Sequence, residues 1–297
     1  MKWTKLPVLF RSVVVSLLVA SPALLLNALL PINIKLSPKV PWAPLIVALC
    51  LWGYWRYLDG YGWPRSTSAT RKRYLRGAVP PTSIWRWSLI AGLLAATSLR
   101  ALLDIARRLS YHPQQDLTSP DVLNRFPFIT VLLLLLTAGA IAGVIEEAAF
   151  RGYLQVPLEN RYGYRTAILI VGLLFVVAHY RLGAPELEPW LVFSPVYFAA
   201  AIAFGALAYL SGSIVPGVIA HALLDAVALL QYWWFGIPKN VWQTGFDFSL
   251  GVRCAVAAIF AVLAYLAYRK LAHIRFQLPE SHPSSGYPLR TTPDTSR

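Results

Sequence analysis

Charged residues are scarce in this sequence. Only 13% of its 297 residues are Asp, Glu, Lys or Arg, whereas 57% are hydrophobic, and the mean hydropathy is +0.54. A soluble domain of this length needs more polar surface than that to cover its outside. The composition therefore excludes an ordinary soluble domain and indicates that lipid surrounds most of the chain.

Cysteine is almost missing, and several catalytic motifs are absent. Cys50 and Cys254 lie in apolar stretches far apart in the sequence, with no CxxC spacing. They form neither a disulfide nor a zinc pattern, so we interpret both as small hydrophobic residues. The sequence also has no internal repeat, no glycine-rich phosphate loop, no GxSxG and no HExxH. These absences exclude the common serine hydrolase and zinc protease motifs.

Acidic residues are few compared with basic ones. There are 27 Lys and Arg against 13 Asp and Glu, which gives a formal net charge of +14. The basic residues fall between the apolar runs, as in a membrane protein with a positive-inside bias and an attraction to anionic lipid. We therefore expect a lipid bilayer as partner and no nucleic acid.

Eight apolar segments come near the roughly 20 residues that a helix needs to cross a hydrocarbon core of about 30 Å. They predict an all-α, polytopic membrane bundle of about eight transmembrane helices, forming one domain over residues 1–276. Residues 277–297 are rich in Pro, Ser and Thr and are predicted to be a disordered tail. The eight segments are 8–30, 42–58, 85–103, 127–150, 166–182, 190–210, 213–235 and 250–269.

Two basic clusters predict the orientation. One lies in the 59–84 loop and the other follows the last apolar segment. With an even number of spans, both clusters and both termini lie on one side, which the positive-inside rule makes the cytoplasm. The few cysteines and the single membrane domain lead us to expect a bacterial inner membrane protein. The clusters contain Arg65, Arg71, Lys72, Arg73 and Arg76, and Arg269, Lys270 and Arg275.

The fourth segment ends in two adjacent carboxylates. An ionisable residue within a span costs about 2.5–3.5 kcal/mol on insertion scales, so it normally faces the bundle interior and has a partner. On an α-helix, Glu147 and Arg151 share a face, while Glu146 points about 100° away from Glu147. Glu147 can therefore pair with Arg151 and leave Glu146 available for chemistry. The glutamates are preceded by small residues that let a neighbouring helix approach closely. These residues are Gly139, Ala140, Ala142 and Gly143.

Two later segments carry histidines. His179 ends the sequence FVVAH in the fifth segment, and His221 begins HALLD in the seventh. His221 and Asp225 lie at i and i+4, so the aspartate could fix the histidine's tautomer or share a ligand with it. His179 alone could equally be a satisfied core histidine. Arg11, Arg100 and Asp104 lie near the ends of other segments, where we expect them to snorkel toward water.

These motifs, in this order, resemble one family of membrane proteins. EExxxR begins at Glu146, FxxxH ends at His179, and HxxxD runs from His221 to Asp225. Together, over about 127–235, they are similar to the CPBP family of intramembrane glutamic endopeptidases. That family includes type II CAAX prenyl endopeptidases and the bacterial Abi or bacteriocin-processing homologues. The family usually has asparagine where this chain has Asp225.

The resemblance implies a membrane-embedded endopeptidase that acts on a membrane-associated or lipidated peptide or protein. In such an enzyme Glu146, with His179, activates a water molecule for attack on the peptide carbonyl, and His221 and Asp225 lie where the oxyanion forms. This mechanism needs no cofactor. Glu147 and Arg151 match the remaining positions and are expected to orient the site.

Two alternatives remain open at this point. A zinc ion could be held by the same side chains and assist the hydrolysis. An ion- or proton-coupled transporter could use the intramembrane carboxylates and histidines as a relay, although we see no two similar halves of the chain. The side chains concerned are Glu146, His179, His221 and Asp225.

Overall fold

The computed structural model describes residues 5–110, 120–180 and 187–277. All regular structure within these ranges is helical, which confirms the all-α fold class. The helices are α1 (Val8–Ala20), α2 (Pro22–Leu36), α3 (Trp42–Leu58), α4 (Ser68–Leu75), α5 (Thr82–Leu109), α6 (Pro120–Leu123), α7 (Phe128–Glu146), α8 (Gln155–Tyr162), α9 (Tyr164–Ala178), α10 (Leu187–Ser211), α11 (Val215–Phe235), α12 (Val241–Thr244) and α13 (Phe248–Gln277). A 3₁₀ turn covers Arg65–Thr67, and a π-helix, Glu147–Leu154, joins α7 to α8.

Six helical stretches in the described part of the chain are long and apolar enough to cross a membrane, so the protein is an integral membrane protein. The expected count of about eight spans is not confirmed. α3 and α9 correspond to the other two predicted segments, but they have only 17 and 15 residues. At 1.5 Å per residue, α9 extends about 22 Å, less than a hydrocarbon core. The six stretches are Val8–Leu36, Thr82–Leu109, Phe128–Tyr162, Leu187–Ser211, Val215–Phe235 and Phe248–Gln277.

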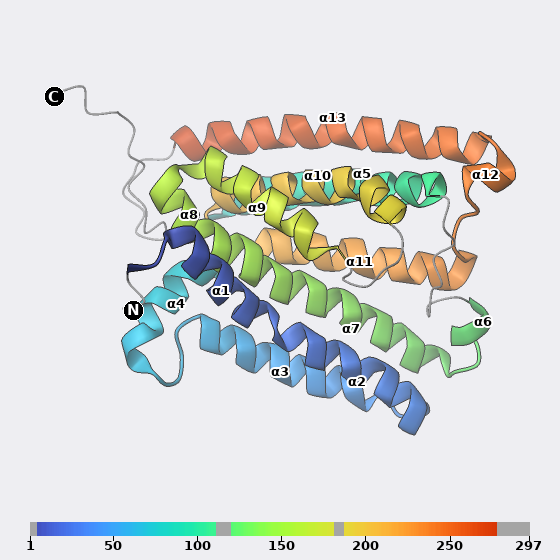
Figure 1. Ribbon diagram of the computed structural model, residues 1–297, viewed down its shortest axis with the longest axis horizontal. Coiled ribbons are helices and arrows are strands. Elements are labelled where there is room, and N and C mark those ends of the chain that lie inside the picture. Colours follow the sequence, from blue (N-terminus) through green and yellow to red (C-terminus); the bar gives the residue numbers. More distant parts are fainter. Residues whose placement is uncertain (1–4, 111–119, 181–186, 278–297) are drawn as a thin grey trace.

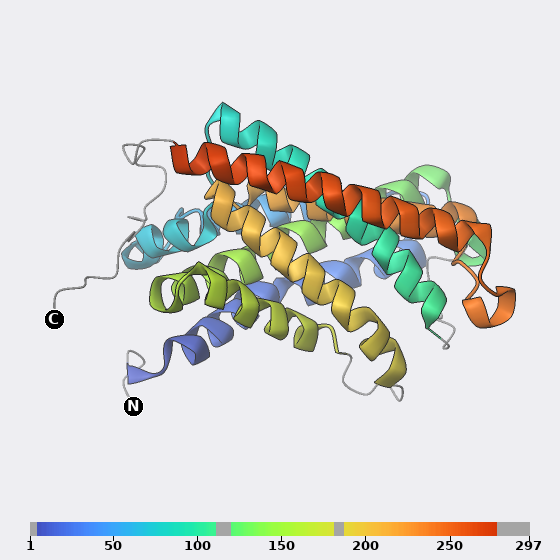
Figure 2. The same cartoon turned by 90° about the horizontal axis from the view of Figure 1, so that it is seen from above.

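The long helices form a bundle in which α7 and α11 pack together near the middle (Figure 1). α5, α10 and α13 cover one side, and α1, α2 and α3 cover the other (Figures 1 and 2). The start of α1 and the end of α13 lie at the same end of the bundle, next to α4 and α8 (Figure 1). This arrangement fits the prediction that both basic clusters lie on one side, and the identity of that side stays a prediction.

α7 and α11 approach each other at two glycines. A Cβ atom on Gly143 would lie 2.8 Å from the backbone nitrogen of Ala222, and one on Gly139 would lie 2.7 Å from the Ala222 carbonyl oxygen. Only glycine permits backbones this close. The close approach predicted from the small residues is therefore confirmed, and the partner is the helix that carries His221 and Asp225.

The prediction that Arg100 and Asp104 snorkel to water is wrong. Only 8% of Arg100 and 4% of Asp104 is exposed, and the two side chains form an ion pair of 2.8 Å. The reason is the length of α5, which continues to Leu109 rather than ending at 103 and so keeps both residues inside the bundle. The predicted tail lies outside the described residues except for Gln277, which ends α13.

Candidate active site

The two adjacent glutamates lie where the helix type changes. α7 ends at Glu146, and the π-helix begins at Glu147 without a break in the chain. π-Helical turns are rare and frequently occur at functional sites. One carbonyl of this segment, that of Ala149, accepts a hydrogen bond of 3.0 Å from Ser16 Oγ on α1. The first helix therefore helps to hold the turn that presents the glutamates.

Glu147 is completely buried and has two partners. Its Oε1 atom lies 2.9 Å from Nδ1 of His221 and 3.2 Å from Nη1 of Arg151. The pairing with Arg151 predicted from the i, i+4 spacing is thus confirmed. A Cβ atom on Gly217 of α11 would lie 2.9 Å from Glu147 Oε2, so the glycine leaves room for this carboxylate.

Arg151 is also completely buried, between two aromatic rings. Its guanidinium lies 4.7 Å from the Phe175 ring centroid and 5.5 Å from that of Phe204. Burial of a charge pair in a low-dielectric interior is costly unless the partners are fixed, and the two rings provide such contacts. The ion pair with Arg151 and the hydrogen bond with His221 together therefore hold Glu147 in place.

His221 lies among three carboxylates. Its Nδ1 donates to Glu147, so Nε2 points toward Glu146 Oε2 at 3.9 Å and Asp225 Oδ2 at 3.7 Å. The ring stacks on Phe204 at 5.2 Å between centroids. The tautomer is therefore set by Glu147, and not by Asp225 as we considered from the sequence. Pro216 is the second residue of α11, and the first turn of a helix tolerates proline, so the helix around His221 is regular.

Glu146 and Asp225 differ from Glu147 in their access to the surroundings. The side chain of Glu146 is 30% exposed and that of Asp225 is 33% exposed, whereas the Glu147 side chain is 0% exposed. The nearest oxygens of both carboxylates lie too far from His221 Nε2 for a direct hydrogen bond, and the Glu146 oxygen is itself buried. Two carboxylates and one imidazole nitrogen thus face the same position.

His179 is less closely connected to this group. It follows the last residue of α9, its Nδ1 donates to the Phe175 carbonyl at 2.8 Å, and its ring stacks on Tyr197 at 4.3 Å. In the described part of the chain it makes no hydrogen bond or ion pair with Glu146, His221 or Asp225. Its partnership with Glu146 stays a prediction.

The side chains considered as alternative zinc ligands do not form a metal-binding group in this conformation. Within the described ranges, no three or more His, Cys, Asp or Glu side chains are arranged to hold a metal ion. Zinc binding stays an alternative, which cleavage in the presence of a chelator tests. The side chains considered for it were Glu146, His179, His221 and Asp225.

Sequence reasoning missed several supporting residues. Phe204 contacts both His221 and Arg151, yet α10 is apolar on all sides and offers no pattern that singles it out. Gly217 was detectable, because it lies four residues before His221 and leaves a gap on the same helix face. Ser16 lies outside the motif region, so its contact with the π-helix required the structure.

Comparison with known proteins gives one match. Residues 128–227 match the family described as Type II CAAX prenyl endopeptidase Rce1-like. No curated protein and no solved structure matches the chain significantly. The matched segment runs from Phe128 to Val227 and so contains both glutamates and both histidines of the site. The match over residues 128–227 confirms the resemblance recognised from the motifs. The Rce1-like family suggests a membrane endopeptidase of the CAAX-protease type, which is a hydrolase.

Proposed function

We propose that this protein is an intramembrane endopeptidase in which Glu146 activates water for hydrolysis of a peptide bond. One observation carries the proposal. Of the carboxylates around His221, Glu147 is buried and committed to Arg151 and His221. The Glu146 side chain is 30% exposed, and its Oε2 atom, which faces His221, is itself buried and makes no hydrogen bond within the described residues. A general base needs lone pairs that no other group occupies, and of the two adjacent glutamates Glu146 meets this condition.

The proposed reaction proceeds without a covalent intermediate. Glu146 takes a proton from water as the water oxygen attacks the peptide carbonyl carbon, which produces a tetrahedral oxyanion. The oxyanion then collapses, the C–N bond breaks, and Glu146 returns the proton to the leaving amine. In its doubly protonated form, His221 donates from Nε2 to the oxyanion while Nδ1 keeps its bond to Glu147. Such donation is stronger in a low-dielectric site than in water.

Asp225 and His179 take supporting roles in this proposal. Asp225 lies 3.7 Å from His221 Nε2, where its carboxylate can orient the imidazole, or in its protonated form donate to the oxyanion itself. His179 helps to position the attacking water, as the family resemblance implies. The substrate is a membrane-associated or lipidated peptide or protein, cleaved within a bacterial inner membrane by an enzyme whose termini are both cytoplasmic.

Cleavage by the detergent-purified full-length protein tests this proposal. A panel of tagged, membrane-associated peptides is incubated with the wild type, Glu146→Gln and His221→Ala, with and without a chelator. General-base catalysis contributes about 10²–10⁴-fold, so Glu146→Gln should lower kcat by that factor and leave the fold intact. Asp121→Asn, at an exposed carboxylate of α6 outside the site, is the matched control and should retain full activity.

Two outcomes would replace the proposal. Cleavage that a chelator abolishes and zinc restores would make the protein a metalloprotease. If no peptide is cut, and Glu146→Gln abolishes ion or proton flux in liposomes, the protein is a transporter. The family match does not favour this second alternative.

A further inference from the structure

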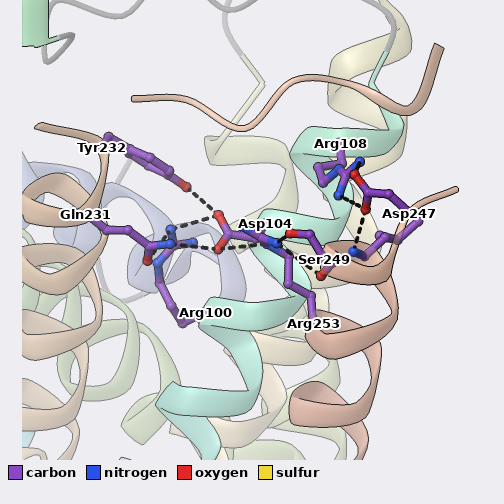
Figure 3. A network of polar contacts seen from close by, with 9 residues as sticks. Arg100, Asp104, Arg108, Gln231, Tyr232, Asp247, Ser249 and Arg253 are labelled. Atoms are coloured by element: carbon purple, nitrogen blue, oxygen red, sulfur yellow. Dashed lines mark hydrogen bonds and ion pairs between the residues drawn. The ribbon is translucent and has the colours of Figure 1, made fainter. Parts of the chain in front are cut away.

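A second polar cluster is buried between α5, α11 and α13 (Figure 3). Its centre is Asp104, whose Oδ1 accepts from Arg100 Nη2 at 2.8 Å and from the Tyr232 hydroxyl at 3.1 Å. Its Oδ2 lies 3.4 Å from Gln231 Nε2 and 3.7 Å from Nε of Arg253. One carboxylate therefore serves two guanidinium groups, and the cluster has more positive than negative charge.

Arg100 has hydrogen-bonding capacity that these contacts do not use. Nη2 donates to Asp104 and, at 3.2 Å, to Gln231. The guanidinium also lies 4.8 Å from the Tyr232 ring centroid, and Nε and Nη1 are buried without a hydrogen-bond partner among the described residues. Leaving buried donors of a charged group unsatisfied is expensive, so these donors need a partner such as a water molecule or an anionic ligand. Nε–H and Nη1–H point to different edges of the guanidinium, so each can donate to one oxygen of such a ligand.

The cluster is close to the candidate active site. Tyr232 follows Asp225 by seven residues on α11, which is about two turns, so both lie on the same helix face roughly 10.5 Å apart along the axis. An extended peptide advances about 3.3–3.6 Å per residue, so one substrate can contact both places.

We propose that Arg100 is a subsite that binds a carboxylate of the peptide substrate. This inference rests on the proposed protease function and adds a specificity element to it. The carboxylate belongs to the part of the substrate that extends from the scissile bond along α11 toward Tyr232. It is either the C-terminal carboxylate or an acidic side chain, since both offer a charged oxygen as acceptor to the guanidinium.

Matched peptides test this subsite. A peptide that the full-length protein cleaves is prepared with a free or an amidated C-terminus and, separately, with Glu or Gln at each position on either side of the scissile bond. A charge-assisted hydrogen bond changes binding about 10- to 100-fold, so the wild type should prefer one carboxylate form by that factor, mainly through KM. Arg100→Gln should abolish the preference by slowing only the carboxylate peptide, and Arg100→Lys should restore part of it. The form that carries the preference, terminus or side chain, identifies the source of the carboxylate.

A control separates recognition from folding. Arg108→Gln makes the same substitution eight residues later on α5, where the arginine pairs with Asp247, and it should leave the preference unchanged. Equal cleavage of all carboxylate and amide forms by the wild type, or an equal loss for both forms in Arg100→Gln, would overturn the subsite. Binding of the same labelled peptides to full-length Glu146→Gln is measured in parallel. Carboxylate-selective binding without cleavage by the wild type would then reject the protease proposal and keep the subsite, whereas non-selective binding would reject the subsite alone.

Discussion

The two buried polar clusters of this bundle have opposite imbalances of charge. Around His221 lie Glu146, Glu147 and Asp225, and Arg151 is the only guanidinium in direct contact with them among the described residues. Around Asp104 the guanidinium groups of Arg100 and Arg253 outnumber the carboxylate. Both arrangements are costly inside a membrane protein, which makes a structural role alone a poor explanation for either.

The difference between the clusters indicates a division of labour. Surplus carboxylates beside an imidazole can accept and return protons, as peptide hydrolysis requires. A surplus of guanidinium groups cannot take up protons at ordinary pH, but it can hold an anion in a fixed orientation. We therefore assign chemistry to the first cluster and recognition to the second.

Replacing Arg151 in the first cluster and Arg100 in the second should give the largest difference in stability between the clusters. Arg151→Gln leaves Glu147 buried without its guanidinium partner, which should destabilise the protein by about 3–5 kcal/mol. Arg100→Gln should cost less, because Asp104 keeps Tyr232, Gln231 and Arg253 as partners. Unfolding of both variants in the same detergent measures the difference. Equal destabilisation would show that the positive charge around Asp104 is not in surplus.

The sequence predicted the first cluster better than the second. The i, i+4 spacing correctly paired Glu147 with Arg151, and the small residues before them correctly indicated a close helix contact. Glu147 as the partner of His221 could not be predicted, because the two residues are far apart in sequence and meet only through the packing of α7 on α11.

The π-helix, which we did not predict, and the wrong placement of Arg100 and Asp104 both concern the local geometry of a helix. The π-helix depends on contacts such as that of Ser16 with Ala149, which no local pattern encodes. Arg100 and Asp104 were misplaced because the apolar run becomes more polar before α5 ends at Leu109. Hydropathy locates the apolar part of a helix, whereas buried ion pairs extend the helix beyond it.

The space beside Glu147 offers a second test of the catalytic cluster. Gly217→Ala places a methyl group 2.9 Å from Glu147 Oε2, and this carboxylate is held by Arg151 and His221 and has little freedom to move. The resulting shift of His221 should lower kcat about tenfold, with an overpacking cost of about 1–3 kcal/mol.

The matched control for this change is Gly251→Ala on α13. A Cβ atom there meets nothing within 4 Å, so activity should stay at the wild-type level. Stability should not fall, because alanine is a better helix former than glycine. Peptide cleavage and unfolding are measured for both variants. Wild-type kcat in Gly217→Ala would mean that the position of Glu147 does not control the reaction.

Removing the contact between α1 and the π-helix should have a smaller effect on stability and activity. Ser16→Ala removes the hydrogen bond to the Ala149 carbonyl and should destabilise the protein by about 1 kcal/mol. Because Ala149 lies two residues after Glu147, kcat should fall several-fold while KM stays unchanged, and Ser16→Thr should recover the activity. Ser21→Ala, which removes an exposed hydrogen bond to Leu18 on the same helix, should change neither quantity.

Asp247, which lies between α12 and α13 outside the membrane-spanning stretches, pairs with Arg108 near the end of α5. Loss of this pair should give the smallest effect and serves as the reference for both buried clusters. Hydrogen bonds from the Arg108 guanidinium and the Leu250 backbone N–H lower the pKa of Asp247 from its usual 3.8 to about 2. A carboxyl with a lowered folded-state pKa contributes stability above its unfolded value, and this contribution is lost as the pH falls toward about 2. Asp247→Asn should therefore lower the unfolding temperature slightly at about pH 6, and the difference from wild type should shrink as the pH falls below about 4.

Because Asp247 is exposed to solvent, the difference at about pH 6 should also decrease with added salt, whereas the loss in Arg151→Gln should be insensitive to salt. A salt-sensitive loss in Arg151→Gln would mean that the carboxylates around His221 are solvated and that this cluster lacks the low-dielectric surroundings that the proposed hydrolysis needs.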